Sequence, residues 1–336
     1  MSDPKPPDAP GNAGPPGGPA RFLRRGRTVF AAVAVAAVVA AIAIAFAVRE
    51  GLAGENPPDG VNTMATHQAG PTTSAASTSA PVPSTGPPRT SAATASAAQA
   101  KARASLAALI AAAPVGGVSV AVRDVTTGRE YGAGAVGGMV EASVAKVQIL
   151  ETMLLQSGGP LTGASDASAR DMIEHSSNDA ADDCFADLGG RDDYLDAEPD
   201  LGLSPVHTVP GPGYLWGLST TSAAEQLRLL ANLVDPSSPL TAPARQYMLT
   251  MMRQVQADQR WGVPAVADPG TVPANKNGWL AIDGDDDLWA VNSDGIVTVQ
   301  GHTLLLSVLT QHNLDFATGT RRVSALMPPL VASVLA

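Results

Sequence analysis

The chain has 336 residues, 21 of them basic and 31 acidic, and its formal net charge is −10. This acidic balance argues against nucleic acid as the main partner. The single cysteine, Cys184, excludes an intramolecular disulfide and a cysteine-based zinc site. The chain has four lysines, at positions 5, 101, 146 and 276. Lysine is among the residue types that are buried least often, so a lysine inside an apolar pattern is informative.

The N-terminal part has the pattern of a membrane anchor. Residues 1–28 are rich in Pro and Gly and are predicted to be disordered in the cytoplasm. A basic cluster then precedes an uninterrupted apolar run over residues 29–48, which is long enough to span a bilayer as a helix. The basic flank predicts that the N-terminus stays in the cytoplasm and that the remainder is extracytoplasmic. The alternative is a signal peptide cleaved near Ala45-Phe46-Ala47, which would release a secreted protein.

The stretch after the apolar run separates it from a globular part. Residues 49–97 are dominated by Pro, Ser, Thr, Ala and Gly, and are predicted to be a disordered linker. Residues 98–336 are enough for one large domain with its own hydrophobic core. We therefore expect a disordered segment, an anchor, a linker and one domain.

The predicted elements of this domain alternate between strands and helices in blocks. A helix is expected over 98–112, and a hairpin follows, with its first strand over 118–122 and its second beginning at Glu130. Helices are then expected from Ser143 and over 167–188, 191–198, 221–234 and 243–254. Strands are expected over 271–282, 288–299 and 303–312, and a last helix over 318–335. This order predicts an α+β fold, in which both ends of the domain share one antiparallel sheet and a helical lobe is inserted between them.

A Ser-x-x-Lys pair stands at the start of one predicted helix. Ser143 suits the N-cap or the first turn, and Val147, Leu150 and Leu154 follow at helical spacing. Lys146 lies about one turn further along, so its amine can reach the Ser143 hydroxyl. Burial and a helix N-terminus both lower the pKa of a lysine, and a neutral amine can accept a proton. The pair is a candidate nucleophile and base; the alternative is a capped helix with a surface lysine.

Two further short patterns follow in the chain. Ser176 and Asn178 lie between two predicted helices, where a hydroxyl can relay a proton and an amide can hold a carbonyl, although serine and asparagine also serve as ordinary helix caps. Lys276-Asn277-Gly278 lies within a predicted strand, where a glycine permits close approach of a ligand. Taken alone, this lysine would be read as an edge-strand residue.

Ser-x-x-Lys, Ser-x-Asn and Lys-x-Gly, in this order, resemble the motifs of penicillin-recognising serine hydrolases, nearest the class A β-lactamases. The resemblance covers residues 98–336 and implies the β-lactamase/transpeptidase-like fold. It implies that Ser143 is the acylated nucleophile, that Lys146 activates it, and that Ser176 passes a proton to the leaving nitrogen. No cofactor or metal is implied, and we expect a monomer.

The resemblance also implies a substrate-binding side of the site. Asn178 would hold a substrate amide, and Lys276 would attract a substrate carboxylate, aided by the neighbouring Asn277 and Gly278. The backbone N–H groups of Ser143 and Trp279 would form the oxyanion hole, where one donor typically contributes about 3 kcal/mol.

The sequence departs from the class A pattern in three places. Ser143 and Ser176 are 33 positions apart, closer than is usual, which predicts a trimmed helical lobe. Asn277 replaces the threonine or serine that the family has in Lys-x-Gly. The loop over residues 203–219 has no Asp or Glu to activate a deacylating water, since Glu198 and Asp200 precede it. His207 is its one side chain with a pKa near neutrality, and it is either a substitute base or a loop residue without a catalytic role.

These observations favour one function and leave two others open. The first is a membrane-anchored extracytoplasmic serine hydrolase that forms an acyl-enzyme with a β-lactam or a related amide. The second is a D-alanyl-D-alanine carboxypeptidase acting on peptidoglycan stem peptides, favoured by the missing loop carboxylate. The third is a ligand-binding relative without catalytic activity.

Overall fold

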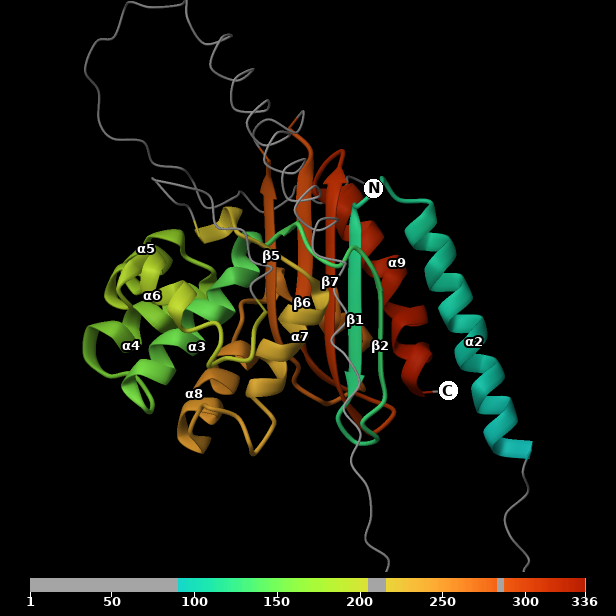
Figure 1. Cartoon of the computed structure of the whole chain (residues 1–336), viewed down its shortest axis with the longest axis horizontal. Coiled ribbons are helices and arrows are strands. Elements are labelled where there is room, and N and C mark those ends of the chain that lie inside the picture. The colour runs from blue at the N-terminus through green and yellow to red at the C-terminus, as the bar shows by residue number, and fades with distance from the viewer. Residues whose placement is uncertain (1–89, 205–215, 283–286, 336) are drawn as a thin grey trace, which may run out of the picture. The chain divides into compact units, whose positions relative to one another are not determined.

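The computed structural model describes residues 90–204, 216–282 and 287–335. Their centre is a five-stranded antiparallel sheet with the strand order β2-β1-β7-β6-β5 (Figure 1). The strands are β1 (Val118–Asp124), β2 (Glu130–Gly134), β5 (Ala274–Ala281), β6 (Trp289–Val299) and β7 (His302–Asn313). In the register, β1 pairs with β7 from Val118↔Thr310 to Asp124↔Leu304. The N-terminal hairpin thus joins the C-terminal strands in one sheet, which confirms the predicted α+β fold.

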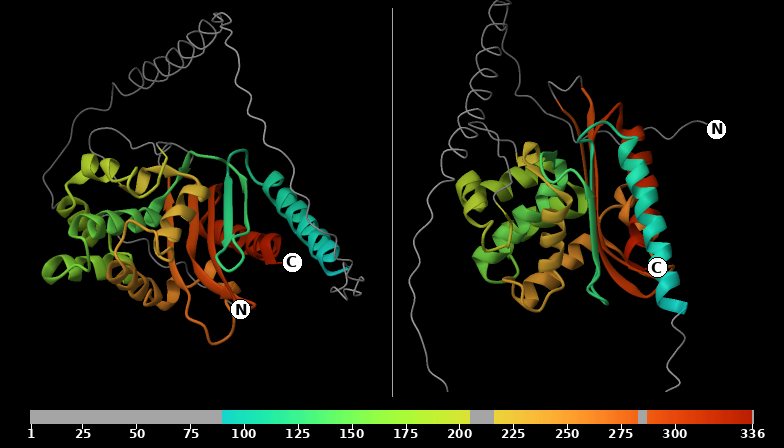
Figure 2. Two further views of the ribbon diagram at one scale, coloured as in Figure 1. Left: turned by 60° about the horizontal axis from the view of Figure 1, so that its bottom comes forward. Right: turned by 45° about the vertical axis from the view of Figure 1, so that its right-hand side comes forward.

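One face of the sheet is covered by the two terminal helices, α2 (Thr90–Ala111) and α9 (Phe316–Leu335) (Figure 2). The core on this side contains Leu106 of α2, Val120 of β1 and Leu330 of α9, each at most 2% exposed. Alternating apolar residues along the strands supply the sheet's contribution to this layer. The helix α2 begins at Thr90, which is earlier than the predicted residue 98 and lies within the stretch predicted as linker.

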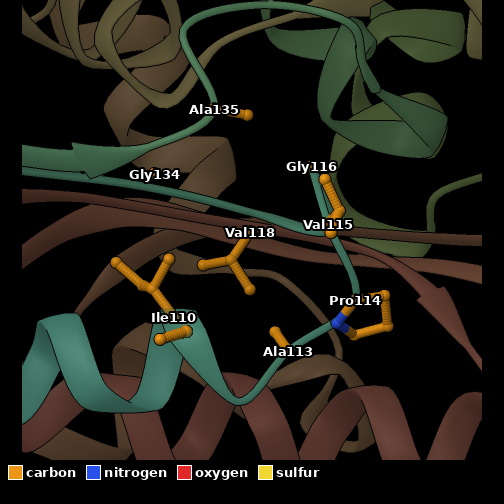
Figure 3. Close-up of a pocket in the computed structure, with 10 residues that line it drawn as sticks. Ile110, Ala113, Pro114, Val115, Gly116, Val118, Gly134 and Ala135 are labelled. Carbon is orange, nitrogen blue, oxygen red and sulfur yellow. The ribbon is translucent and has the colours of Figure 1, made fainter.

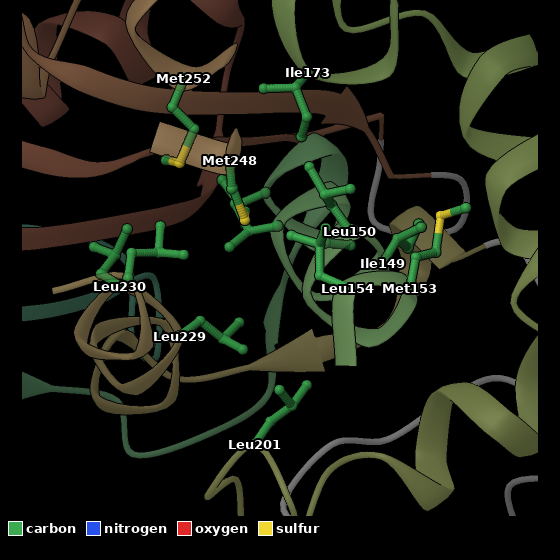
Figure 4. Close-up of a cluster of buried hydrophobic side chains, with 14 of the residues drawn as sticks. Ile149, Leu150, Met153, Leu154, Ile173, Leu201, Leu229, Leu230, Met248 and Met252 are labelled. Atoms are coloured by element: carbon green, nitrogen blue, oxygen red, sulfur yellow. The ribbon is translucent and has the colours of Figure 1, made fainter. Parts of the chain in front are cut away.

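The other face of the sheet carries the helical lobe. Its helices are α3 (Ala145–Ser157), α4 (Gly163–Arg170), α5 (Asn178–Asp187), α6 (Gly190–Asp196), α7 (Ala223–Asn232) and α8 (Ala242–Arg253). The helix α3 is buried along ten consecutive residues, Ala145–Leu154, so it runs through the interior of the lobe. Its side chains Ile149, Leu150 and Leu154 pack in the same cluster as Met248 and Met252 of α8 (Figure 4).

The structure refines two local predictions in the lobe. Ser143 lies in a 3-10 turn, η1 (Ala142–Val144), that leads directly into α3 at Ala145, so it is a first-turn residue rather than the N-cap. The predicted helical stretch over 167–188 is divided into α4, a π-helical turn, η2 (Asp171–His175), and α5, with Ser176 in the left-handed conformation after η2. The break lies where the sequence placed Ser176 and Asn178 between two helices.

No helix in the three described ranges is long and apolar enough to cross a membrane. The apolar run over residues 29–48 lies outside those ranges, as do His207 and most of the loop that contains it.

Candidate active site

Ser143 is held on a tight turn between the sheet and the helical lobe. The preceding residue, Ala142, has a φ of +50°, a conformation that costs free energy for any residue except glycine. The side-chain amide of Asn292 on β6 donates to the carbonyl oxygens of Val140 and Glu141, at 2.9 Å each. These two hydrogen bonds attach the turn to the sheet. The Ser143 side chain remains partly exposed, although its neighbours on both sides are buried.

Gly278 brings β5 directly against this turn. A Cβ atom at Gly278 would lie 2.7 Å from the backbone nitrogen of Ser143 and 2.8 Å from that of Val144. Real Cβ atoms do not approach backbone atoms so closely, so only glycine fits here. The strand that carries Lys-x-Gly is therefore in backbone contact with the turn that carries Ser-x-x-Lys. The two motifs are far apart in the chain, since 132 positions separate Lys146 from Gly278.

Lys146 is fully buried and directs its amine at the break between η2 and α5. Its Nζ donates to the carbonyl oxygen of Ser176 at 2.6 Å and to Oδ1 of Asn178 at 2.9 Å, and it lies 3.3 Å from Oγ of Ser176. It also lies 4.8 Å from the ring centroid of Trp216. The predicted hydrogen bond between Lys146 and Ser143 is not found among the described residues. The reason is that three oxygens around the break occupy the three positions of the amine.

Ser176 connects the two lysines. Its hydroxyl accepts from Nζ of Lys276 at 2.8 Å, and the same Lys276 amine donates to the carbonyl oxygen of Asn277 at 3.0 Å. Ser176 has a φ of +60° and is 3% exposed, so the packing around it holds an unfavourable backbone conformation. One hydroxyl thus joins Ser-x-x-Lys, Ser-x-Asn and Lys-x-Gly in a single hydrogen-bonded cluster.

Burial lowers the pKa of Lys146 well below that of a free lysine, and the nearby Lys276 lowers it further, against the opposing effect of Asp182 and Asp171. Burial also lowers the pKa of Lys276 to about 7. A buried amine that loses its proton near neutral pH can accept one from a hydroxyl. At its position, Lys146 can keep its hydrogen bonds to the Ser176 carbonyl and Asn178 with two N–H groups and still have a free lone pair.

Asn277 points away from this cluster, because successive side chains of a strand lie on opposite faces of the sheet. Its Nδ2 donates to the carbonyl oxygens of Gln259 at 2.9 Å and Trp261 at 3.0 Å. Both N–H groups are used within the protein, so the amide fixes the segment 259–261 against β5. The adjacent Trp279 packs against Trp261 and Phe316, with ring centroids at 6.1 and 5.4 Å, which holds this part of β5 in place.

Comparison with known proteins gives the same family as the motifs. Residues 166–326 match the family model described as the β-lactamase enzyme family, a segment that includes Ser176, Asn178 and Lys276–Trp279. The globular part has a β-lactamase-like fold.

Solved structures share the fold of this domain. A β-lactamase from Chitinophaga pinensis is 17% identical, with a TM-score of 0.56, and the match covers 67% of this chain and 97% of that one. PBP-A is 18% identical, with a TM-score of 0.58 and coverage of 69% and 94%. The TLA-1 extended-spectrum β-lactamase is 15% identical, with a TM-score of 0.58 and coverage of 70% and 99%. No curated protein sequence matches the chain.

The β-lactamase-like domain also buries acidic side chains that the motif analysis missed. Burial raises the pKa of Glu141 to about 7, against hydrogen bonds from Ser219 and Gln226, and Glu198 raises it further. Burial likewise raises the pKa of Glu198 to about 7. The Oε1 atom of Glu198 lies 3.5 Å from Nε2 of Gln148, and Gln148 follows Lys146 by two residues in α3. Glu141 stands two residues before Ser143 in an otherwise apolar stretch, and this position in the sequence could have indicated a buried acidic side chain.

The raised pKa of Glu141 predicts that stability falls as the pH rises from about 4.5 to about 7. In this window the unfolded chain has released the proton and the folded protein keeps it, so raising the pH favours unfolding. One such group contributes up to about 1.4 kcal/mol per pH unit to the change in the free energy of unfolding. Urea unfolding at pH 5 and pH 7 should show a smaller loss for Glu141→Gln than for the wild type. The exposed Glu130→Gln is the control, and an unchanged loss in Glu141→Gln would contradict the prediction.

A pocket elsewhere on the domain has no part in this chemistry. It lies where α2 ends and is lined by Ile110, Pro114, Val118 and Gly134, among others (Figure 3). None of its lining residues has an ionisable side chain, so it offers neither a base nor a nucleophile.

Proposed function

We propose that the chain is a membrane-anchored extracytoplasmic serine hydrolase in which Ser143 forms an acyl-enzyme with a β-lactam or a related amide. The observation that carries the proposal is the Ser176 hydroxyl, which lies within 3.3 Å of both buried lysine amines. One of these lysines follows the Ser143 turn by two residues, and the other precedes Gly278, which contacts that turn. A PBP-A variant has been solved as an acyl-enzyme with penicillin G, which supports a β-lactam as the acylating ligand.

The proposed acylation uses the groups of this cluster in sequence. Neutral Lys146 takes the hydroxyl proton of Ser143, and the Ser143 oxygen attacks the carbonyl carbon of the amide. The N–H groups of Ser143 and Trp279 stabilise the oxyanion, a contribution of about 3 kcal/mol for each donor. Ser176 then passes a proton, received from the Lys146 ammonium, to the departing nitrogen as the C–N bond breaks. Lys276, when charged, attracts the substrate carboxylate, and Asn178 holds a substrate amide.

Hydrolysis of the acyl-enzyme should be slow, because the loop over residues 203–219 lacks an Asp or Glu to activate water. We expect a fluorescent penicillin to label the protein covalently and to remain attached when excess unlabelled penicillin is added. Gel fluorescence over time measures the loss of label. Absence of any label would contradict acylation, and loss within seconds would contradict the slow hydrolysis.

The same missing carboxylate favours a second candidate, a D-alanyl-D-alanine carboxypeptidase that acts on peptidoglycan stem peptides. The proposed membrane anchor and linker would hold such an enzyme near the cell wall. Release of D-alanine from a pentapeptide, measured with a coupled amino-acid oxidase, would favour this candidate. Rapid hydrolysis of nitrocefin without release of D-alanine would reject it.

A further inference from the structure

Asp294 occupies an unusual position in the middle of the sheet. In the strand register, Lys276 of β5 is paired with Asp294 of β6, which is paired with Ser307 of β7. Directly paired residues of antiparallel strands place their side chains on the same face, with Cβ atoms about 5 Å apart. All three residues are 0% exposed. Asn292, two residues before Asp294, reaches the turn beside Ser143, so this row faces the helical lobe and the candidate site.

The Asp294 carboxyl is poorly hydrogen-bonded. Both of its oxygens and the hydroxyl oxygen of Ser307 are buried without a partner in good hydrogen-bond geometry, and only weak contacts from Ser307 and the Val308 N–H act on the carboxyl. Burying a carboxylate without a partner costs several kcal/mol, so the group needs a proton or a nearby positive charge. Burial accordingly raises the pKa of Asp294 to about 8, against Ser307 and the Val308 N–H, and Glu141 adds to the increase.

The charged groups around Asp294 come from three sides. Lys276 is the cation on the adjacent strand. Lys146 on α3 is the next cation, and it is close enough to Lys276 for that lysine to lower its pKa. Glu141 precedes the nucleophile turn, and Glu198 lies behind Glu141. The pKa values of both glutamates are raised to about 7, and neither can supply a positive charge. Lys276 is the cation at the strand position paired with Asp294, although its Nζ donates to Ser176 and to the Asn277 carbonyl.

We propose that Asp294 is the internal counter-charge of Lys276, and that a proton moves between the two groups according to whether an anion occupies the site. In the empty site the two groups share one proton, which is carried by Asp294 as an O–H in some of the molecules and by Lys276 as an N–H in the others. When a substrate carboxylate arrives, the Asp294 O–H bond breaks, an N–H bond forms at Lys276, and the proton count of the pair is unchanged. Asp294 is thus a positioning residue that acts through Lys276. The effect of a substrate carboxylate on this proton rests on the proposed function. The coupling of the Asp294 and Lys276 titrations does not depend on it.

The four lysines of the chain make this proposal directly measurable. Protein labelled with ¹³C at the lysine side chains gives a small set of signals, and Lys276→Met assigns the one from Lys276. Two coupled groups lose their protons in two steps that belong to the pair. We expect Lys276 in the wild type to titrate in two steps and to keep part of its charge above pH 8. In Asp294→Asn it should titrate in a single step near pH 7, so that its final midpoint falls by about 1 pH unit or more.

Two controls make the outcome decisive. Glu151→Gln removes another fully buried carboxyl, which is hydrogen-bonded to Asn232 in the helical lobe, and should leave the Lys276 titration unchanged. Asp294→Val provides a second variant with good strand propensity if the asparagine variant fails to fold. Identical Lys276 titrations in the wild type and in a folded Asp294 variant would overturn the proposal.

The titration needs no substrate, so it separates this proposal from the proposed function. If acylation occurs, Asp294→Asn should also lower the second-order rate constant of acylation by a penicillin at pH 8 by about tenfold or more, and a chromogenic amide without a carboxylate should not show this change. An equal change for both substrates would contradict the role of the Lys276 charge. If no acyl-enzyme forms but the two-step titration is observed, the proposed function fails and the link between Asp294 and Lys276 stands.

Discussion

Replacing Lys146 with methionine should reduce the rate of acylation by about a thousandfold, within the range of 10² to 10⁴ that a positioned base contributes. Methionine fills a similar volume but has no lone pair to accept the Ser143 proton. The change also removes the donor to the Ser176 carbonyl and to Asn178, so the break between η2 and α5 loses its central contact. The rate is measured by rapid quenching of the reaction with penicillin, followed by intact-mass analysis.

The pH dependence distinguishes a base from a structural lysine. In the wild type, acylation should increase as the pH rises through the lowered pKa of Lys146, because the neutral amine is the active form. This acidic limb should be absent from Lys146→Met. Lys101→Met, on the exposed side of α2, is the matched control and should behave as the wild type. Wild-type acylation by a folded Lys146→Met would show that the amine is not the base.

Gly278→Ala should disrupt the site by moving β5 away from the nucleophile turn. The added methyl group would lie 2.7 Å from the Ser143 nitrogen and 2.8 Å from the Val144 nitrogen, and neither backbone atom can rotate aside. Inserting a methyl group into such a contact typically costs about 1–3 kcal/mol, which corresponds to a fall in Tm of several degrees for a domain of this size. Because the displaced strand carries Lys276 and the Trp279 N–H, acylation should fall by more than a hundredfold.

The control for this change is Gly137→Ala, because a Cβ atom at Gly137 meets nothing within 4 Å. Differential scanning calorimetry and the acylation rate are measured for both variants. If Gly278→Ala kept the wild-type Tm and acylation rate, the backbone contact between β5 and the Ser143 turn would not be needed for the site.

The sequence predicted the elements whose patterns are local. The alternating residues of β1 and the apolar runs of β6 and β7 identified the strands, and the order of the blocks identified the fold. The three short motifs identified the segments that meet at Ser176. These signals succeed because hydrophobic periodicity and chain order are present in the sequence itself.

The remaining features depend on neighbours that are distant in the chain. By residue type Ser143 suits a helix cap or a first turn, but the contacts of its turn with Gly278 and Asn292 come from strands that are distant in the chain. The Lys146 amine turns to Ser176 rather than Ser143 because the break before α5 offers it three oxygens. Asp294 looks like an ordinary strand residue until the register places it beside Lys276.

The most direct test of the account is to find which residue carries the acyl group after treatment with penicillin. The protein is digested, and the peptides are analysed by tandem mass spectrometry, with Ser143→Ala treated in parallel. The account predicts a penicilloyl adduct on Ser143 in the wild type and none in Ser143→Ala. An adduct on a different residue, or an adduct that persists in Ser143→Ala, would contradict it.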